Sequence, residues 1–236
     1  MTESTPDRRR VLGAGALIGA VAMTPGASVR AATPSSSGSA FTPKPAPMAF
    51  DPKAVPGLSE KLLVSHYDAN YAGAVKRLGA ISAQFAALDP ATAPGFVVNG
   101  LKREELIAWN SMILHELYFA GLGAPTRPGE ALAHAIERDF GGEARWRAEF
   151  TGMGKALGGG SGWVLLTWSH RDRRLVNQWA ADHTMTLAGA TPIVALDMYE
   201  HAYAIDYGAK AAAYVDAVMG ALDWSSADAI FAKASA

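Results

Sequence analysis

The chain has 236 residues, is 50% hydrophobic and carries a net charge of -1 at pH 7, which suits one globular domain or two small layers that share a core. This balance of charge gives no sign of a nucleic-acid partner. Because the sequence contains no cysteine, disulfides, thiolate metal sites and cysteine nucleophiles are excluded, and any transition metal must be held by imidazole and carboxylate groups.

Residues 1–31 have the composition of an export signal. The basic cluster Arg8-Arg9-Arg10 precedes a weakly hydrophobic run, rich in glycine and alanine, that extends to Met23, and Val29-Arg30-Ala31 offers a cleavage site. The segment resembles a twin-arginine signal, so we expect a periplasmic or secreted protein with no stable membrane association once the signal is removed. The alternative is an N-terminal membrane anchor. The apolar run is a poor membrane span, because it is short and rich in glycine.

The next two segments are predicted to be an arm and a helical hairpin. Residues 32–56 are rich in Pro, Ser and Gly, which is typical of a linker and an extended arm. Residues 57–125 are predicted to form the hairpin, with Ser59 as the cap of its first helix. The apolar positions of the first helix, which ends near Leu88, are Leu63, Tyr67, Tyr71, Val75 and Leu78. The apolar stripe of the second helix, which follows a loop over residues 90–100 and ends at Gly121, is Leu106, Trp109, Ile113 and Leu117.

Residues 126–236 are predicted to form an α/β domain with a small three-stranded antiparallel sheet, so the fold class is α+β. The predicted elements are helices over Glu130–Asp139 and Glu143–Ala156, strands over Trp163–Trp168, Arg174–Ala180 and Ile193–Leu196, a helical region from Asp197 to about Trp224, and a short helix from Ser226.

Asp197 and His201 are the first candidates for metal ligands. The strand predicted before Asp197 places it where a helical pattern begins, and a spacing of four residues puts Asp197 and His201 on the same face of a helix. The alternative is that Asp197 caps the helix and His201 is a histidine of the core.

His66 and His115 complete the candidate set. Each lies inside one helix of the predicted hairpin, so the hairpin can bring both to the end of the sheet where Asp197 and His201 project. Three imidazoles and one carboxylate without thiolate favour iron or manganese with a position left open for redox chemistry.

Four segments match the pattern of a known family. They are Ser59-Glu60 with His66-Tyr67, Trp109-Asn110 with His115 and Tyr118-Phe119, Gly160-Ser161-Gly162-Trp163, and Asp197 with Glu200-His201-Ala202-Tyr203. Over about residues 55–233 the chain resembles the iron/manganese superoxide dismutase family. The resemblance implies one iron or manganese ion per subunit, held by His66, His115, Asp197 and His201 with a water or hydroxide as fifth ligand, and superoxide as the substrate.

The resemblance also implies roles for residues around the ligands. His183 stands where the family has a glutamine or histidine that bonds the solvent ligand, and Trp163 would form a wall of the site. Glu200 would reach His201 of the partner subunit across a homodimer interface; the alternative for Glu200 is a solvated helix face. Tyr71 is a further candidate for helping proton delivery.

Several channel positions depart from the family pattern. They are Asn70 for a histidine, Ala74 for a tyrosine, Tyr199 for a tryptophan, Ala204 for a tyrosine, and Ala211, with Lys210 beside it, for an arginine. These losses would widen the channel and weaken the positive field that draws an anion inward. We therefore expect a dismutase of weakened activity, with an exported metal-binding protein or a metalloenzyme without dismutase activity as the alternative.

Overall fold

The computed structural model describes residues 38–236, and the predicted export signal at 1–31 lies outside them. Residues 38–56, where an extended arm was predicted, contain no helix or strand. The backbone N–H of Phe41 donates to Ser82 Oγ at 2.7 Å, and that of Ala46 donates to the Tyr71 hydroxyl at 2.6 Å. These hydrogen bonds attach the arm to the first long helix of the hairpin.

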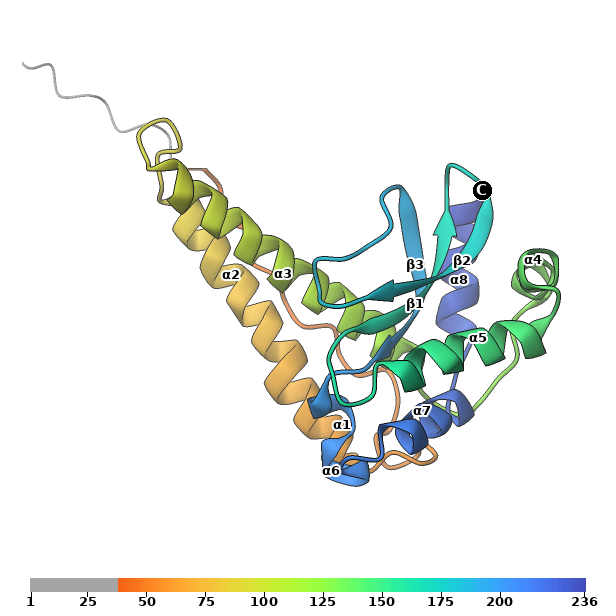
Figure 1. The fold of residues 1–236 in the computed structure, drawn as a ribbon. Coiled ribbons are helices and arrows are strands. Elements are labelled where there is room, and N and C mark those ends of the chain that lie inside the picture. The colour runs from red at the N-terminus through yellow and green to blue at the C-terminus, as the bar shows by residue number, and fades with distance from the viewer. Residues whose placement is uncertain (1–37) are drawn as a thin grey trace, which may run out of the picture. The chain divides into compact units, whose positions relative to one another are not determined.

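The first long helix of the hairpin has three consecutive parts. They are α1 (Glu60–Ser65), the π-helix η1 (His66–Tyr71) and α2 (Ala72–Ala86). Ser59 caps α1 as predicted, because its hydroxyl oxygen accepts from the N–H of Leu62 at 3.1 Å. The second helix, α3 (Gly95–Ala120), packs along α2, as Figure 1 shows.

The predicted apolar stripe of α3 was wrong for three of its four positions. Leu106, Trp109 and Ile113 are 47%, 38% and 37% exposed. The helix has apolar residues on more than one side, so the pattern alone does not tell which side is buried. The face that packs inward is that of Ala108, Ser111, Met112, Leu114, His115, Tyr118 and Phe119.

The C-terminal half contains the predicted sheet, in the order β2-β1-β3 with both pairs antiparallel. The strands are β1 (Trp163–Ser169), β2 (Arg174–Ala180) and β3 (Ala190–Asp197). Helices α4 (Glu130–Phe140) and α5 (Glu143–Ala156) precede the sheet, and α5 packs on β1 while α3 packs on β3 (Figure 1). The α+β fold predicted from the sequence is therefore confirmed.

The chain after Asp197 differs from the long helix that was predicted. It forms a 3-10 turn, η2 (Glu200–Ala202), then α6 (Ala204–Tyr207), α7 (Ala211–Gly220) and α8 (Ser225–Ser235). Tyr199 is in extended conformation, with ψ 147°, so Asp197 and His201 do not share a helix face. Asp197 instead ends a strand, and the chain turns sharply to bring His201 back to it.

Residues 38–236 lie within one compact unit, and the division between the predicted hairpin and α/β domains stays a prediction. None of the helices within residues 38–236 is both long and apolar enough to cross a membrane.

Candidate metal centre

Four side chains from separate parts of the chain converge on one point. The Nε2 atoms of His66, His201 and His115 lie 3.1, 3.2 and 3.5 Å from Oδ2 of Asp197. All four ligand atoms lie within 4.8 Å of one another. The hairpin contributes two of these residues, and the end of β3 with the following turn contributes the other two, so the fold joins the four predicted ligands at one site.

His66 is the first residue of the π-helix η1. The π-helical turn is rare and occurs mostly at functional sites, where the extra residue per turn changes the direction of the side chains. The side chain of His66 is fully buried, and its ring lies against those of His201 and Tyr118 at centroid distances of 4.7 and 5.0 Å. This packing fixes the direction of Nε2 toward Asp197.

His115 is oriented by its own helix. The Nδ1–H group donates to the carbonyl oxygen of Ser111, four residues earlier, at 2.6 Å. In the neutral ring this leaves Nε2 with a lone pair, and Nε2 is buried with no hydrogen-bond partner among residues 38–236. A metal ion is the partner that satisfies such an atom.

Asp197 is held as an anion at the edge of the sheet. It is fully buried and pairs with Trp163 across β1 and β3. Its Oδ1 accepts from the N–H of Tyr199 at 2.8 Å, which leaves Oδ2 for the histidines. Burial alone would raise the pKa of Asp197, but the hydrogen bonds from His201 and His66 outweigh it and hold the pKa below its usual range.

Two of the imidazoles, those of His66 and His115, are held neutral. Burial lowers the pKa of His66 from its ordinary value despite the hydrogen bond with Asp197, and burial lowers the pKa of His115 to about 4. Neutral imidazole and ionised carboxylate are the protonation states that bind metals.

The spacing of the ligand atoms also fits one ion. Two atoms that each lie about 2.1 Å from an ion are roughly 3.0 to 3.6 Å apart when the angle at the ion is between about 90° and 120°. The distances of 3.1, 3.2 and 3.5 Å to Asp197 Oδ2 fall in this range. The four residues therefore suit a mononuclear metal in both chemistry and geometry.

His183 lies beside the ligands and is oriented by Trp163. The indole Nε1–H of Trp163 donates to Nδ1 of His183 at 3.0 Å, and the ring of His183 stacks on Tyr199 at 4.9 Å and 10°. The side-chain amide of Asn110 donates to the backbone carbonyl of His183 at 2.6 Å. Burial lowers the pKa of His183, so the ring is neutral at pH 7 and carries its proton on Nε2.

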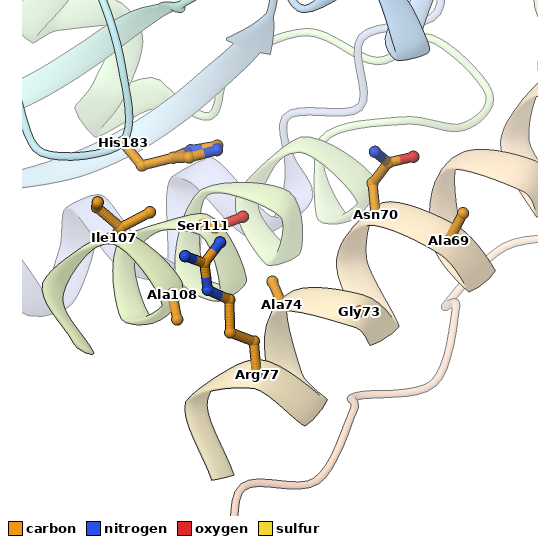
Figure 2. A pocket seen from close by; sticks show the side chains of 9 residues that line it. All are labelled: Ala69, Asn70, Gly73, Ala74, Arg77, Ile107, Ala108, Ser111 and His183. Carbon is orange, nitrogen blue, oxygen red and sulfur yellow. The ribbon is translucent and has the colours of Figure 1, made fainter. Parts of the chain in front are cut away.

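His183 is one of the residues that line a pocket of about 290 Å³. Figure 2 shows this pocket between the first long helix of the hairpin and α3, with the short side chain of Ala74 from α2 and the amide of Asn70 from η1. Both are positions at which the resemblance led us to expect a departure from the family pattern. The lining residues are Ala69, Asn70, Gly73, Ala74, Arg77, Ile107, Ala108, Ser111 and His183.

The other two predicted site residues have different surroundings. The hydroxyl of Tyr71 donates to Glu116 Oε1 at 2.8 Å and accepts from Ala46, so its partners belong to the arm and α3. The expected proton role of Tyr71 has no support in these contacts. Glu200 is exposed at the start of η2, next to His201.

Some residues that position the ligands or line the pocket were not predicted from the sequence. Tyr214, from α7, donates to the backbone carbonyl of Asp197 at 2.8 Å and has no local pattern that links it to the ligands. Ser111 could have been found, because it lies one helical turn before His115. Arg77 in the pocket wall was also missed.

Comparison with known proteins agrees with this geometry. Residues 128–230 match the family model of iron/manganese superoxide dismutases, C-terminal domain. The chain is 69% identical over 178 residues to the superoxide dismutase [Fe] of Cupriavidus metallidurans, covering 75% of this chain and 90% of the relative. It is 33% identical over 186 residues to the superoxide dismutase [Fe] of Aquifex pyrophilus, covering 75% and 86%, and 31% identical over 183 residues to superoxide dismutase [Mn] 1 of Halobacterium salinarum, covering 76% and 90%.

Proposed function

Because the chain belongs to the iron/manganese superoxide dismutase family, we propose that it disproportionates superoxide to dioxygen and hydrogen peroxide at a mononuclear iron or manganese site. The observation that carries this proposal is the convergence of His66, His115, Asp197 and His201 on one point. A metal held by these four residues would supply one-electron redox chemistry, in which one superoxide is oxidised to dioxygen and a second, together with two protons, is reduced to hydrogen peroxide.

His183 would hold a proton for this reaction. Because Nδ1 accepts from Trp163, the proton is on Nε2, where it is available to a group inside the site. Trp163 is fully buried and its ring lies 5.2 Å from that of His115, so it also excludes water from one side of the ligands. Trp163 thus acts as a wall and as a positioning residue for His183.

Assembly as a homodimer is also proposed. Glu200 is exposed next to His201, whose side chain is 26% exposed while that of Asp197 is fully buried. A carboxylate in this position can reach His201 of the partner subunit and orient its ring from outside. The molecular mass in solution of wild-type protein and a Glu200→Ala variant tests this assembly.

The size of the pocket gives a second candidate function. A pocket of about 290 Å³ would admit a molecule larger than superoxide, so the alternative is a metalloenzyme without dismutase activity. The substitution Ala74→Tyr distinguishes the two functions. A weak dismutase should gain rate when a hydroxyl donor returns to the pocket, whereas a protein with no dismutase activity should not change.

Export by the twin-arginine route is proposed from residues 1–31. Its support is the basic cluster followed by the glycine-rich apolar run. Replacing Arg8 and Arg9 together by lysine should leave the full-length chain in the cytoplasm. Cell fractionation of this variant against the natural sequence tests the proposal, and unchanged export of the double variant would contradict it.

The proposed reaction is tested by the decay of superoxide in stopped flow. We expect protein loaded with one equivalent of iron or manganese to accelerate the decay well above the same concentration of free metal. Zinc-loaded protein is the matched control, because zinc has no redox chemistry. Iron is the expected natural metal, since the 69% identical relative is an iron protein by name. No acceleration with either redox metal would overturn the dismutase proposal.

A further inference from the structure

Arg77 occupies the pocket next to His183. It lies on α2, three residues after Ala74, and lines the 290 Å³ pocket together with His183. In Figure 2 its side chain extends between α2 and α3, and the guanidinium points toward Ser111 and the side of the pocket where His183 lies. The small side chains of Ala74 and Ala108 leave the space that the guanidinium uses.

Arg77 is the one permanently charged residue among those that line this pocket within residues 38–236. It donates from Nη2 to Glu104, which also accepts from Arg103 at 3.1 Å. Glu104 therefore holds Arg77 in position in the pocket wall, and Arg103 shares the carboxylate from outside the pocket.

Arg77 is close enough to His183 to act on it electrostatically. The pKa of His183 is lowered mainly by burial, Asp197 and Asp182 oppose this lowering, and the positive charge of Arg77 adds the smallest of the contributions. The side chain of Arg77 is 55% exposed, so it can meet a ligand that enters from solvent. One end of the guanidinium is bound to Glu104, and its positive charge can attract a small anion in the pocket.

We propose that Arg77 is the residue that recruits the anionic substrate, drawing small monoanions into the pocket and directing them past Ser111 toward His183 and the metal site. The proposal deepens the proposed function, since superoxide is a monoanion. A single charge at a partly exposed position changes the capture of an anion by roughly three- to tenfold at low salt, and the effect decreases as salt screens it.

The experiment compares Arg77→Gln with Arg103→Gln in iron-loaded protein. Both variants remove one positive charge and a bond to Glu104, but only Arg77 lines the pocket. The first measurement is the affinity for azide, followed by absorbance, and the second is the salt dependence of kcat/KM for superoxide. We expect Arg77→Gln to weaken azide binding roughly fivefold and to flatten the salt dependence, while Arg103→Gln stays within about twofold of wild type. Arg77→Lys should recover most of both effects, because it restores the charge.

The outcomes separate this proposal from the dismutase function. Equal azide affinity and equal salt dependence in Arg77→Gln and Arg103→Gln would overturn the role of Arg77, whatever the dismutase rate. Azide binding that depends on Arg77 in a protein without dismutase activity would support anion recruitment and overturn only the dismutase function. Loss of azide binding that Arg77→Lys does not recover would show that the arginine acts through its shape, and would also overturn the proposal.

Discussion

The indole nitrogen of Trp163 donates a hydrogen bond to Nδ1 of His183 at 3.0 Å, and the backbone of Trp163 pairs with Asp197 across the sheet. One residue at the start of β1 thus connects the buried carboxylate with the neutral histidine next to it. The direction of the hydrogen bond determines which nitrogen of His183 carries the proton.

Trp163→Phe should lower the superoxide rate and keep the metal. The phenyl ring fills most of the space but has no N–H, so the tautomer and orientation of His183 are no longer fixed. Loss of such an outer contact costs about 10- to 100-fold in activity. The measurement is kcat per metal-loaded subunit. Trp179→Phe is the matched control, because Trp179 is 50% exposed on β2, and an equal loss in both variants would contradict the role of Trp163.

His115→Ala should lower metal content. Its Nε2 is one of four converging ligand atoms, whereas His134 is an exposed histidine of α4, so His134→Ala serves as the control. We expect elemental analysis to find about one metal per chain in the control and a small fraction of that in His115→Ala. Since a metal bound only by the folded protein stabilises it, chelation should lower the Tm of the wild type by several degrees and leave that of His115→Ala nearly unchanged. Full metal content in His115→Ala would exclude His115 as a ligand.

Gly162→Ala should destabilise the fold. Gly162 has a φ of 130°, and a Cβ atom there would lie 2.2 Å from the carbonyl oxygen of Ala180, which is backbone and cannot move cheaply. The expected loss in free energy of unfolding is about 2 kcal/mol or more, from combined strain and displacement of β2. Gly152→Ala, in α5 with open space around it, should instead be neutral or stabilise by up to about 1 kcal/mol. Denaturant unfolding of the metal-free proteins measures both, and similar values for the two variants would contradict the predicted clash.

Tyr71→Phe should affect stability more than catalysis. Its hydroxyl joins the backbone N–H of Ala46 to Glu116, so removing it leaves one donor without its partner, at a cost of about 1 to 2 kcal/mol. Ser82→Ala, which removes another hydrogen bond to the arm, should have a similar effect on unfolding. We expect both variants to keep the superoxide rate within about twofold of wild type. A tenfold lower rate in Tyr71→Phe alone would restore the proton role that the sequence predicted.

The sequence predicted the elements and the ligands better than the details around them. The strands around Trp163 and Asp197 follow from continuous apolar runs, and the ligand set follows from the family segments. The inward face of α3 could not be predicted, because Leu106, Trp109 and Ile113 are as apolar as the residues that are buried. The partners of Tyr71 depend on how the arm packs, which no periodic pattern encodes. The position of Arg77 likewise depends on the space left by small residues on two helices.

The most direct test of the central claim is anomalous diffraction from crystals of the metal-loaded protein, collected on both sides of the iron or manganese absorption edge. We expect one anomalous peak per chain, within about 2.3 Å of Nε2 of His66, His115 and His201 and of Oδ2 of Asp197. A peak bound by other residues, or no peak between these four in protein that contains stoichiometric metal, would contradict the account.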